Sequence, residues 1–421
     1  MVMNELLTLE QAAGLLGRNK QTLRRWDASG KLVAKRDPMS NFRYYLKSQL
    51  EAFDEFQNMN PQATPNAHSG RPEHTYSVLE LFAGAGGLAI GLEQAGLKCL
   101  ALNELDKYAA ATLRKNRPHW TVLEGDIREQ TFTQYNGKVD VVTGGFPCQA
   151  FSYAGKRFGF QDARGTLFYE FARTVQETQP KICIGENVKG LLNHDGGRTL
   201  KTMIAILDEI GYRVVDPKVL RAIFYNVPQK RERLILVGVR KDLDTNFEYP
   251  APGKTVYNLI DALKKGPLFN TDVPDSPGTK YPASKAAILE LVPPGGYWRD
   301  LPLDKQKSYM QKSFYLGGGK TGMARRIKWD EPSLTLTCSP AQKQTERCHP
   351  DHTRPFTVRE YARIQTFPDD WTFSGPVSAQ YKQIGNAVPV NLAKALGGAI
   401  VRFLNEAYAK QAQPEVLEEA L

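Results

Sequence analysis

The chain has 421 residues, of which 41% are hydrophobic and 24% charged, so it is long and apolar enough to bury sizeable cores in two or three domains. Its formal net charge of +10 suits a polyanionic partner, although a merely basic soluble protein has the same balance. We find no signal peptide and no apolar run long enough to cross a bilayer, which argues against secreted and membrane-spanning classes and predicts a cytoplasmic protein. The five cysteines show no paired-ligand spacing, so we expect reduced thiols and no metal site.

Residues 1–53 are predicted to form a small module of their own. Thr8 is placed to cap a first helix, a turn leads into a second helix from Gln21 to Ala28, and residues 30–45 suggest a hairpin. The pattern is similar to the winged helix-turn-helix of the MerR and excisionase class, which implies that Arg24 and Arg25 contact DNA. An interaction or dimerisation module remains the alternative. Residues 54–74, rich in Asn, Pro, Gln and Gly, indicate a linker.

The next element is a short apolar strand from residue 78 that enters a glycine turn and then a helix. Leu88, Leu92 and Ala95 recur at helical spacing after the glycines. Glycines let the backbone approach a ligand closely, and the N-terminus of a helix offers free N–H groups. A nucleotide-like cofactor is therefore expected, a signal shared by binders of NAD, FAD and S-adenosylmethionine.

Two further strands end in acids. The strand Cys99 to Leu102 is followed by Glu104, about where such folds bind a ribose hydroxyl, and a third strand ends before Asp126. Taken singly, each acid is more often an ordinary helix-capping or turn residue than a functional one. Together they suit a cofactor that lies across the edge of a sheet.

A cysteine follows the next strand. Val139 to Val142 lead into a glycine turn and then Cys148, which directly follows a proline. A lone cysteine is usually a buried apolar residue, but ligands collect at the carboxyl ends of strands in an open α/β sheet. The following strand ends at Glu186, and Arg231 and Arg233 precede the strand from residue 234 to 239. A thiol, an acid and two arginines are thus predicted to share one site.

In this order the motifs resemble those of bacterial DNA (cytosine-5) methyltransferases of the restriction-modification type. The resemblance covers residues 77–400 and rests on segments 82–87, 103–106, 125–127, 145–149, 186–188, 229–233, 354–368 and 383–390. It implies an α/β, Rossmann-like, S-adenosylmethionine-dependent catalytic domain over residues 75–260. A target-recognition domain and hinge over 261–385, a helix returning to the catalytic domain over 386–410 and a tail over 411–421 would follow.

The resemblance also implies catalytic roles. Cys148 would supply a thiolate that adds to carbon 6 of cytosine, and Glu186 would hydrogen-bond or protonate ring nitrogen 3 from a desolvated pocket. Arg233 would contact the base oxygen, Arg231 would orient the site, and Asn187 would hold the loop. A glycine-containing basic loop would close over a flipped base with Ser152, Gly155, Lys156 and Arg157.

Cofactor contacts carry over in the same way. The residues implied are Phe82, Gly84, Gly86, Gly87, Leu88, Glu104, Leu105, Asp126, Ile127, Pro147, Asn386 and Val388. Leu105 departs from the family, which often has tryptophan there, so aliphatic packing against the adenine is expected. Asn386 and Val388 are expected at the start of the returning helix.

The loosely composed block from residue 261 to 385 supplies candidates for DNA contacts. Basic and polar side chains there are Arg325, Arg326, Lys343, Gln344, Thr345 and Arg347, each also typical of a solvated loop. The run from Ser339 to Pro350 looks like that of members that methylate GGNCC or GGWCC sites. A partner restriction endonuclease and catalysis by a monomer are expected from the same resemblance.

Two other functions stay open at this point. One is a DNA-binding regulator with an inactive methylase body, which the N-terminal module suggests. The other is methylation of tRNA, as in some family relatives. Intact Cys148, Glu186 and Arg233 argue against the first. The sizeable recognition block and the N-terminal module favour duplex DNA over tRNA.

Overall fold

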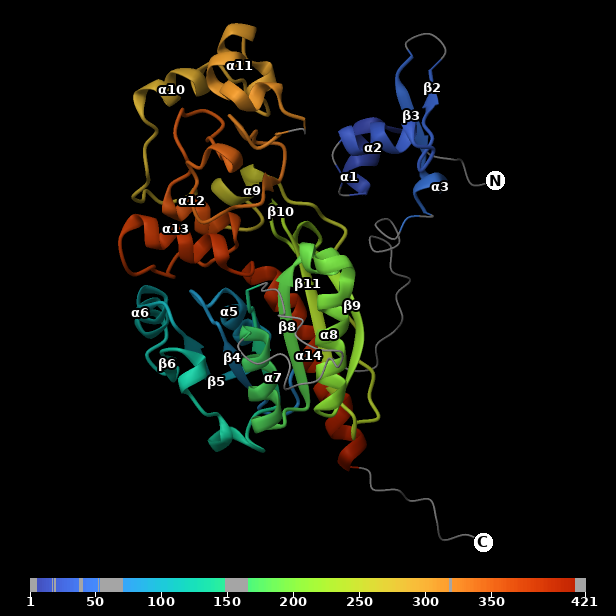
Figure 1. Cartoon of the computed structure of the whole chain (residues 1–421), viewed down its shortest axis with the longest axis vertical. Coiled ribbons are helices and arrows are strands. Elements are labelled where there is room, and N and C mark those ends of the chain that lie inside the picture. Colours follow the sequence, from blue (N-terminus) through green and yellow to red (C-terminus); the bar gives the residue numbers. More distant parts are fainter. Residues whose placement is uncertain are drawn as a thin grey trace.

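The computed structural model describes residues 6–16, 18, 20–37, 41–51, 53, 71–147, 166–317 and 320–412. Its centre is a seven-stranded sheet with the order β6-β5-β4-β7-β8-β11-β9 (Figure 1). The strands are β4 (Ser77–Leu81), β5 (Lys98–Glu104), β6 (Val122–Glu124), β7 (Val141–Gly144), β8 (Ile182–Val188), β9 (Tyr212–Arg221) and β11 (Glu232–Arg240). Strands β4 to β8 pair in parallel, whereas β11 runs antiparallel to both β8 and β9, so the sheet is mixed.

Helices cover both faces of this sheet, as the nearly continuous apolar character of its inner strands requires. Helices α5 (Gly87–Gln94) and α14 (Val390–Ala412) pack against the face that carries Val78, Val141 and Ile184. Helices α7 (Leu167–Thr178) and α8 (Arg198–Glu209) cover the opposite face. The α/β class predicted from the sequence is thus confirmed, with a mixed sheet.

Strand β9 was not predicted from the sequence. It contains Pro217, which cannot donate a ladder hydrogen bond, and the register with β11 shifts between Ile235 and Val237 at this point. A proline is tolerated only at an edge or a bulge, and β9 is the edge strand beyond β11. Because proline is unusual in strands, the sequence did not predict β9, which pairs with β11 on the side away from β8.

The returning helix begins later than expected. Asn386 is the last residue of α13 (Val377–Asn386), and Val388 lies in the short link before α14. Pro389 explains the break, because a residue that precedes proline is disfavoured in the helical region. The span Val377–Ala412 is long and apolar enough for a membrane by length and composition, yet 72% of its most apolar window is buried, as in the core helix of a soluble protein.

The block between β11 and α14 contains two hydrophobic cores. Helices α10 (Ala283–Glu290) and α11 (Leu303–Met310) surround a small core with Leu289, Trp298 and Met310. In contrast, α9 (Leu259–Leu263), α12 (Val358–Ile364) and α13 pack with α5 and with α6 (Lys107–Asn116) of the sheet layer. Strand β12 (Ser333–Leu334) of this block pairs in parallel with β10 (Gln229–Lys230), which directly precedes β11. This pair joins the block to the large sheet.

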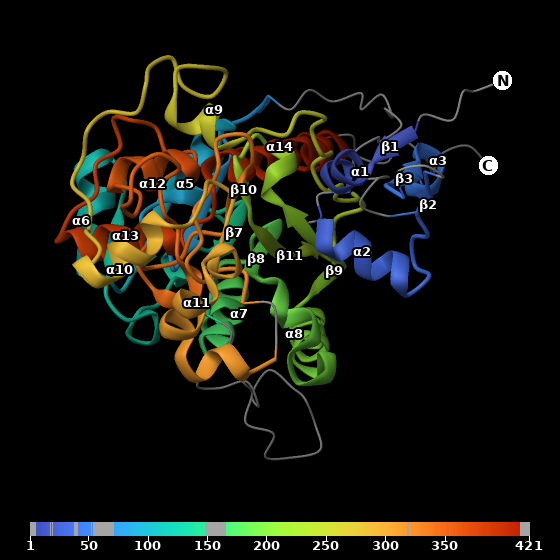
Figure 2. The same ribbon diagram turned by 90° about the horizontal axis from the view of Figure 1, so that it is seen from above.

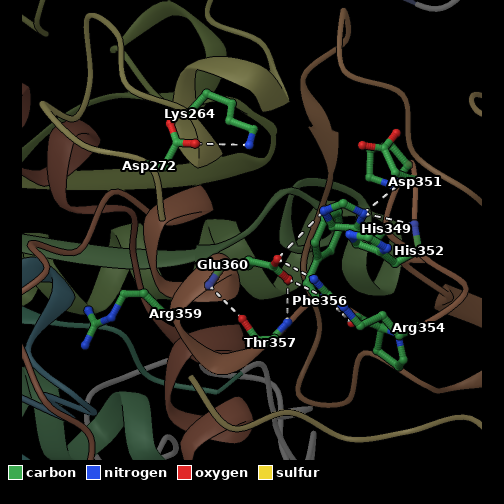
Figure 3. A network of polar contacts seen from close by, with 12 residues as sticks. Lys264, Asp272, His349, Asp351, His352, Arg354, Phe356, Thr357, Arg359 and Glu360 are labelled. Atoms are coloured by element: carbon green, nitrogen blue, oxygen red, sulfur yellow. Dashed lines mark hydrogen bonds and ion pairs between the residues drawn. The ribbon is translucent and has the colours of Figure 1, made fainter. Parts of the chain in front are cut away.

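A buried polar network fixes α12 below the α10–α11 core (Figure 3). Nδ1 of His349 accepts hydrogen bonds from the backbone N–H groups of Asp351 (3.1 Å) and His352 (3.3 Å). The Glu360 carboxylate accepts from Nη1 (2.7 Å) and Nη2 (2.8 Å) of Arg354, and with Thr357 it forms the capping box that begins α12. Burial lowers the pKa of His349 to about 4, so its imidazole is neutral in the folded protein at neutral pH.

The N-terminal module consists of β1 (Leu6–Thr8), α1 (Leu9–Leu15), α2 (Lys20–Ala28), β2 (Lys35–Arg36), β3 (Arg43–Leu46) and α3 (Lys47–Leu50). The predicted cap is confirmed, because Oγ1 of Thr8 accepts from the Gln11 N–H at 3.2 Å. The two helices and the hairpin strands β2 and β3 form where the sequence predicts them. Strand β1, which pairs with β3, was not predicted.

Candidate active site

A cavity of about 650 Å³ opens at the carboxyl ends of the parallel strands. Segments from both ends of the catalytic fold form it, because the turn after β4 and the link before α14 lie side by side. Its lining residues are Glu80, Phe82, Ala83, Gly84, Gly87, Leu88, Glu104, Leu105, Asp106, Ala109, Gly145, Phe146, Pro147, Glu186, Asn187, Val188, Arg231, Arg233, Lys382, Gln383, Gly385, Asn386, Ala387 and Val388. Most of the residues proposed from the sequence as cofactor or catalytic groups are thus neighbours in space.

The glycine turn adopts left-handed backbone conformations at three positions. Phe82, Gly84 and Gly86 have φ values of 57°, 56° and 84°. A positive φ is unusual for phenylalanine and typical of ligand-binding turns, and here it accompanies a Phe82 side chain that lines the cavity. Gly86 does not line the cavity; a Cβ there would lie 2.8 Å from Cδ2 of Leu113, so this glycine permits close packing.

Glu104 holds the turn and still has room for a ligand. Its Oε2 accepts from the Gly84 N–H at 2.6 Å and its Oε1 from the Asp106 N–H at 2.7 Å. A carboxylate has further acceptor capacity, which ribose hydroxyls can use. Burial raises the pKa of Glu104, although backbone hydrogen bonds from Asp106, Gly84 and Leu105 oppose that rise. Nearby Glu80 carries a buried Oε2 that has no hydrogen-bond partner among the described residues. Burial, with the neighbouring Glu104 charge, holds the pKa of Glu80 well above its usual range, so its carboxyl group is suited to donate as well as to accept. The wall thus offers polar groups of both kinds, which fits S-adenosylmethionine.

The predicted adenine contacts divide into two groups. Leu105 is 67% exposed and lines the cavity, so its side chain is free to cover a flat ring. Asp126 and Ile127 do not line the cavity. The Asp126 carboxylate accepts from the Arg128 N–H at 3.0 Å and pairs with its guanidinium, and Ile127 is buried in the core near Phe132. A short acid followed by a helical turn is easily satisfied by such local bonds.

Glu186 and Arg233 form an ion pair at the other end of the cavity. Nε of Arg233 lies 2.5 Å from Oε1 of Glu186, and both side chains are largely buried. In the antiparallel ladder Glu186 is opposite Ile235 and Arg233 is opposite Val188, so the two charged residues are diagonal neighbours on one face of the sheet. The antiparallel direction of β11 brings its amino end to the carboxyl end of β8.

Arg231 is buried and ties three segments together. Its Nη1 donates to the Leu336 carbonyl at 3.1 Å and its Nη2 to the Gly385 carbonyl at 3.0 Å. Burial, with the neighbouring Arg233 charge, lowers the pKa of Arg231. Arg231 lies between β10 and β11, and its contacts join this point to the segment after β12 and to the end of α13, which is the arrangement of a positioning residue.

The loop after β7 ends beside Glu186. A Cβ on Gly145 would lie 3.1 Å from Oε2 of Glu186, and Nδ2 of Asn187 donates to the Phe146 carbonyl at 2.9 Å. That hydrogen bond is the contact that the expected role of Asn187 requires. Pro147 lines the cavity, and the expected nucleophile Cys148 follows it directly but lies outside the described residues. The loop residues Ser152, Gly155, Lys156 and Arg157 also lie outside them.

Two of the candidate DNA contacts are used inside the protein. Arg326 is 4% exposed and donates to the carbonyls of residues 289, 292, 349 and 350, while Arg347 is 5% exposed and donates to those of residues 335 and 346. Neither guanidinium is available to a base edge or a phosphate in this conformation. Arginines in a loop-rich block can face DNA or solvent, but here the two guanidinium groups satisfy backbone carbonyls in turns around a small core.

The remaining candidates in this block differ in exposure. Arg325 is half-buried and pairs with Glu331 at 2.8 Å. Lys343 is half-buried and donates to the Tyr309 carbonyl at 2.6 Å. Thr345 is half-buried and shares a hydrogen bond with Thr337, and Gln344 is exposed. Only Gln344 of this set presents a fully exposed side chain.

The sequence reasoning missed several residues that line the cavity. Glu80 lies within the apolar strand β4 and was not predicted to line the site. An acid at a buried strand position is unusual and could have indicated a functional residue. Lys382 pairs with Asp106 at 2.8 Å and so links α13 to the start of α6 at the rim. Outside the lining itself, Sγ of the exposed Cys338 donates to Oδ1 of Asn386 at 2.9 Å. No periodicity in the sequence indicates this last contact.

The fold and the site define an α/β protein with a cavity at the carboxyl edge of its sheet, lined by a glycine turn and by an acid and arginine pair. The chain belongs to the C-5 cytosine-specific DNA methylases, because the model of that family matches residues 76–402. It is accordingly a DNA cytosine-5 methyltransferase of the type II restriction-modification class.

Named relatives agree over nearly the whole chain. Type II methyltransferase M.Eco47II of Escherichia coli is 60% identical over 407 residues, covering 96% of this chain and 97% of that protein. Type II methyltransferase M.PspPI of Psychrobacter sp. (strain TA137) is 59% identical over 94% of this chain and 95% of its own length. Among solved structures, a Spodoptera frugiperda DNMT2 mutant has a TM-score of 0.55 at 17% identity over 77% of this chain and 99% of its own, which supports the fold alone.

Proposed function

We propose that the chain transfers a methyl group from S-adenosylmethionine to carbon 5 of a cytosine that is flipped out of a short duplex DNA site. The observation that carries this proposal is the Glu186–Arg233 ion pair, 2.5 Å long, in the same cavity as the glycine turn and Glu104. One end of the cavity suits a nucleoside-containing cofactor. The other end offers an acid and a guanidinium to the polar edge of a pyrimidine.

The residues divide the chemistry as follows. Carbon 5 of cytosine is a poor nucleophile, so the Cys148 thiolate adds to carbon 6 and the electron pair of the 5,6 double bond moves towards carbon 5. Glu186 hydrogen-bonds or protonates ring nitrogen 3, and Arg233 donates to the base oxygen, so the charge that develops on the ring is stabilised. S-adenosylmethionine, when bound, supplies an electrophilic methyl group. Solvent water then takes the proton from carbon 5, and its electron pair restores the 5,6 double bond as the Cys148 thiolate leaves. Any proton on ring nitrogen 3 returns to Glu186, which restores the ring and the enzyme.

Other residues bind and orient. Glu104 accepts from the ribose hydroxyls, while Phe82 and Leu105 cover the flat part of the cofactor. Arg231 holds the segments behind the base in register through its two carbonyl contacts. Because carbon 5 and carbon 6 of a stacked base are inaccessible, the nucleotide must leave the helix, and the loop after Cys148 would close over it.

The biological setting follows from the class. We propose that methylation protects DNA from a partner restriction endonuclease, that the enzyme acts as a monomer in the cytoplasm, and that its target is GGNCC-like or GGWCC-like. The target rests on the run from Ser339 to Pro350. The N-terminal module is proposed to be a winged helix-turn-helix that binds DNA through α2.

Two measurements test this function. Labelled S-adenosylmethionine is incubated with the protein and either duplex DNA or tRNA, and we expect label in DNA only. An oligonucleotide with 5-fluorocytosine at the target should trap a covalent adduct, because fluorine cannot leave as the proton does. The adduct should map to Cys148 and be absent from Cys148→Ala. Label in tRNA alone, or an adduct at another residue, rejects the proposal.

A further inference from the structure

The N-terminal module contacts the catalytic sheet at specific residues. Leu15, near the end of α1, packs against both the core of the module and the core under α14. Nη1 of Arg221 in β9 donates to the Leu16 carbonyl at 2.6 Å, where the C-terminal end of α1 leaves an acceptor free. The module therefore has an apolar and a polar contact with the β9 and β11 side of the sheet.

Glu232 completes this contact. Its carboxylate accepts from Nζ of Lys189 and Nε of Arg221, both at 3.1 Å, and lies 3.7 Å from Nη1 of Arg18 in the module. Burial alone would raise the pKa of Glu232, but these hydrogen bonds lower it overall. Glu232 directly precedes Arg233 on β11, so successive side chains point to opposite faces. Glu232 therefore contacts the module, and Arg233 pairs with Glu186.

The module also carries basic side chains that its own acids do not neutralise. Lys20 pairs with Glu10, and Arg36 and Arg43 both pair with Asp27. The remaining exposed basic residues have no carboxylate partner in the described parts of the chain, and they are Arg24, Arg25, Lys31 and Lys35. They lie on α2, on the segment that follows it and at the start of β2. The Lys31 ammonium lies over the Trp26 ring at 4.5 Å, and no described carboxylate neutralises these cations, which suits phosphate groups.

The position of the module indicates which phosphate groups its basic side chains can reach. In Figure 1 the module lies beyond the upper end of β9 and β11, and the α10–α11 block lies beyond the same end of the sheet on the other side. Figure 2, from above, also places the module on the β9 side and the α10–α13 region on the opposite side, with the strand ends between them. A duplex with its target base at these strand ends passes the recognition block on one side and the module on the other.

We propose that the basic face of the N-terminal module binds the backbone of the same duplex, on one flank of the target site, while the base is in the cavity. This inference rests on the proposed function and extends it, because it assigns a second DNA contact to the methylation complex itself. Once the target base is in the cavity, the docked module is close to the flanking DNA, so its effective concentration there is high. Its contact with the DNA backbone therefore raises the affinity for the duplex without any new base contact.

The test compares hemimethylated duplexes, in which the single unmethylated cytosine fixes the orientation of the enzyme. A short duplex has about 14 base pairs, roughly 48 Å at ~3.4 Å per base pair, and two longer ones add about 20 base pairs to one side or the other. Binding is measured by fluorescence anisotropy over a range of salt concentrations. Methyl transfer to the short duplex is followed in parallel.

We expect extension on one side only to tighten binding about tenfold. The double variant Arg24→Ala with Arg25→Ala should lose that gain, and its salt slope on the extended duplex should fall by about 2, since each phosphate contact contributes ~0.9. Methylation of the short duplex should be unchanged. Lys98→Ala, which removes an exposed cation at the amino end of β5, is the matched control and should keep the gain.

A second variant tests the docking. Arg18→Glu places a carboxylate against Glu232, so it should weaken the gain from extension while leaving the exposed basic face intact. Equal affinity for all three duplexes, or a full gain in the Arg24 and Arg25 variant, overturns the inference and assigns the basic face to another partner. Failure of the unaltered protein to methylate any of the three duplexes instead contradicts the proposed function, so the two outcomes are separable.

Discussion

Arg233 and Glu186 lie 47 residues apart in the chain, yet Nε of one is 2.5 Å from Oε1 of the other. The antiparallel direction of β11 causes this contact, because the amino end of β11 lies beside the carboxyl end of β8. Had β11 run parallel to β8, as an unbroken series of crossovers would give, Arg233 would lie at the opposite edge of the sheet. The strand direction is therefore part of the site.

Removing the arginine of this pair should impair catalysis more than cofactor binding. Arg233→Ala deletes a donor to the base and leaves a buried carboxylate unpaired, so we expect kcat to fall by about a hundredfold or more. The dissociation constant of S-adenosylmethionine should change less than about threefold, an energy below ~0.7 kcal/mol. Single-turnover methyl transfer and equilibrium dialysis provide the two numbers. Arg213→Ala, on the outer edge strand β9, is the control.

Glu104 should set the pH dependence of cofactor binding. Burial raises the pKa of Glu104, so its acceptor capacity is lost on acidification at a higher pH than for an ordinary glutamate near ~4.3. Affinity for S-adenosylmethionine should therefore weaken as the pH falls through the weakly acidic range. Glu104→Gln should bind about 10 to 100 times more weakly at pH 7, as for the loss of a hydrogen bond to a charged group. Its affinity should also vary less with pH, and an unchanged profile would remove Glu104 from the ribose site.

The contact between α5 and α14 should be intolerant of a single methyl group. A Cβ on Gly91 would lie 2.4 Å from the Cβ of Ala393 and 2.5 Å from the Val390 carbonyl oxygen. Gly91→Ala should therefore lower the free energy of unfolding by about 1 to 3 kcal/mol, despite the better helix propensity of alanine. Urea unfolding measures this change. Gly398→Ala, also helical, adds a Cβ that would lie 3.8 Å from Nη1 of Arg402, an ordinary contact, so it should be neutral or stabilising.

His349 should contribute to acid sensitivity. Its pKa is about 4 in the folded protein and near ~6.5 in the unfolded chain, so the unfolded state binds more protons between these values. The stabilisation is complete above pH ~6.5 and is lost as the pH falls, by up to about 3 kcal/mol at pH ~4. His349→Gln should show a shallower loss of unfolding free energy over this range. Parallel curves for the two proteins would contradict the assignment of a neutral, buried imidazole.

Much of the catalytic fold was accessible from the sequence because local signals agree with the tertiary structure there. The strands β4, β5, β7, β8 and β11 are apolar runs, and each is followed or preceded by a polar motif, so their ends could be placed to within a few residues. The pairing of Glu186 with Arg233 required the strand direction, which no local pattern reports. The sequence did not predict strand β9 because it contains Pro217, and proline argues against a strand except at the edge of a sheet.

The roles of polar residues outside the sheet were harder to predict, because the charge of a side chain does not indicate whether it is buried or exposed. Arg326 and Arg347 satisfy backbone carbonyls within a small core, whereas Arg24 and Arg25 are exposed. Asp126 was expected at the cofactor, yet its carboxylate bonds to Arg128 two residues away. In each case the alternative partner is contributed by turns whose geometry cannot be inferred from spacing.

The long-range closure of the cavity has a consequence for biosynthesis. Its walls combine Phe82 and Gly87, made early, with Asn386 and Val388, made near the end, and α5 is covered by α14. A ribosome that has completed only the sheet has produced no closed pocket. We therefore expect methylating capacity to arise only once the final helix has emerged and packed, and we expect chains truncated before Val390 to lack it.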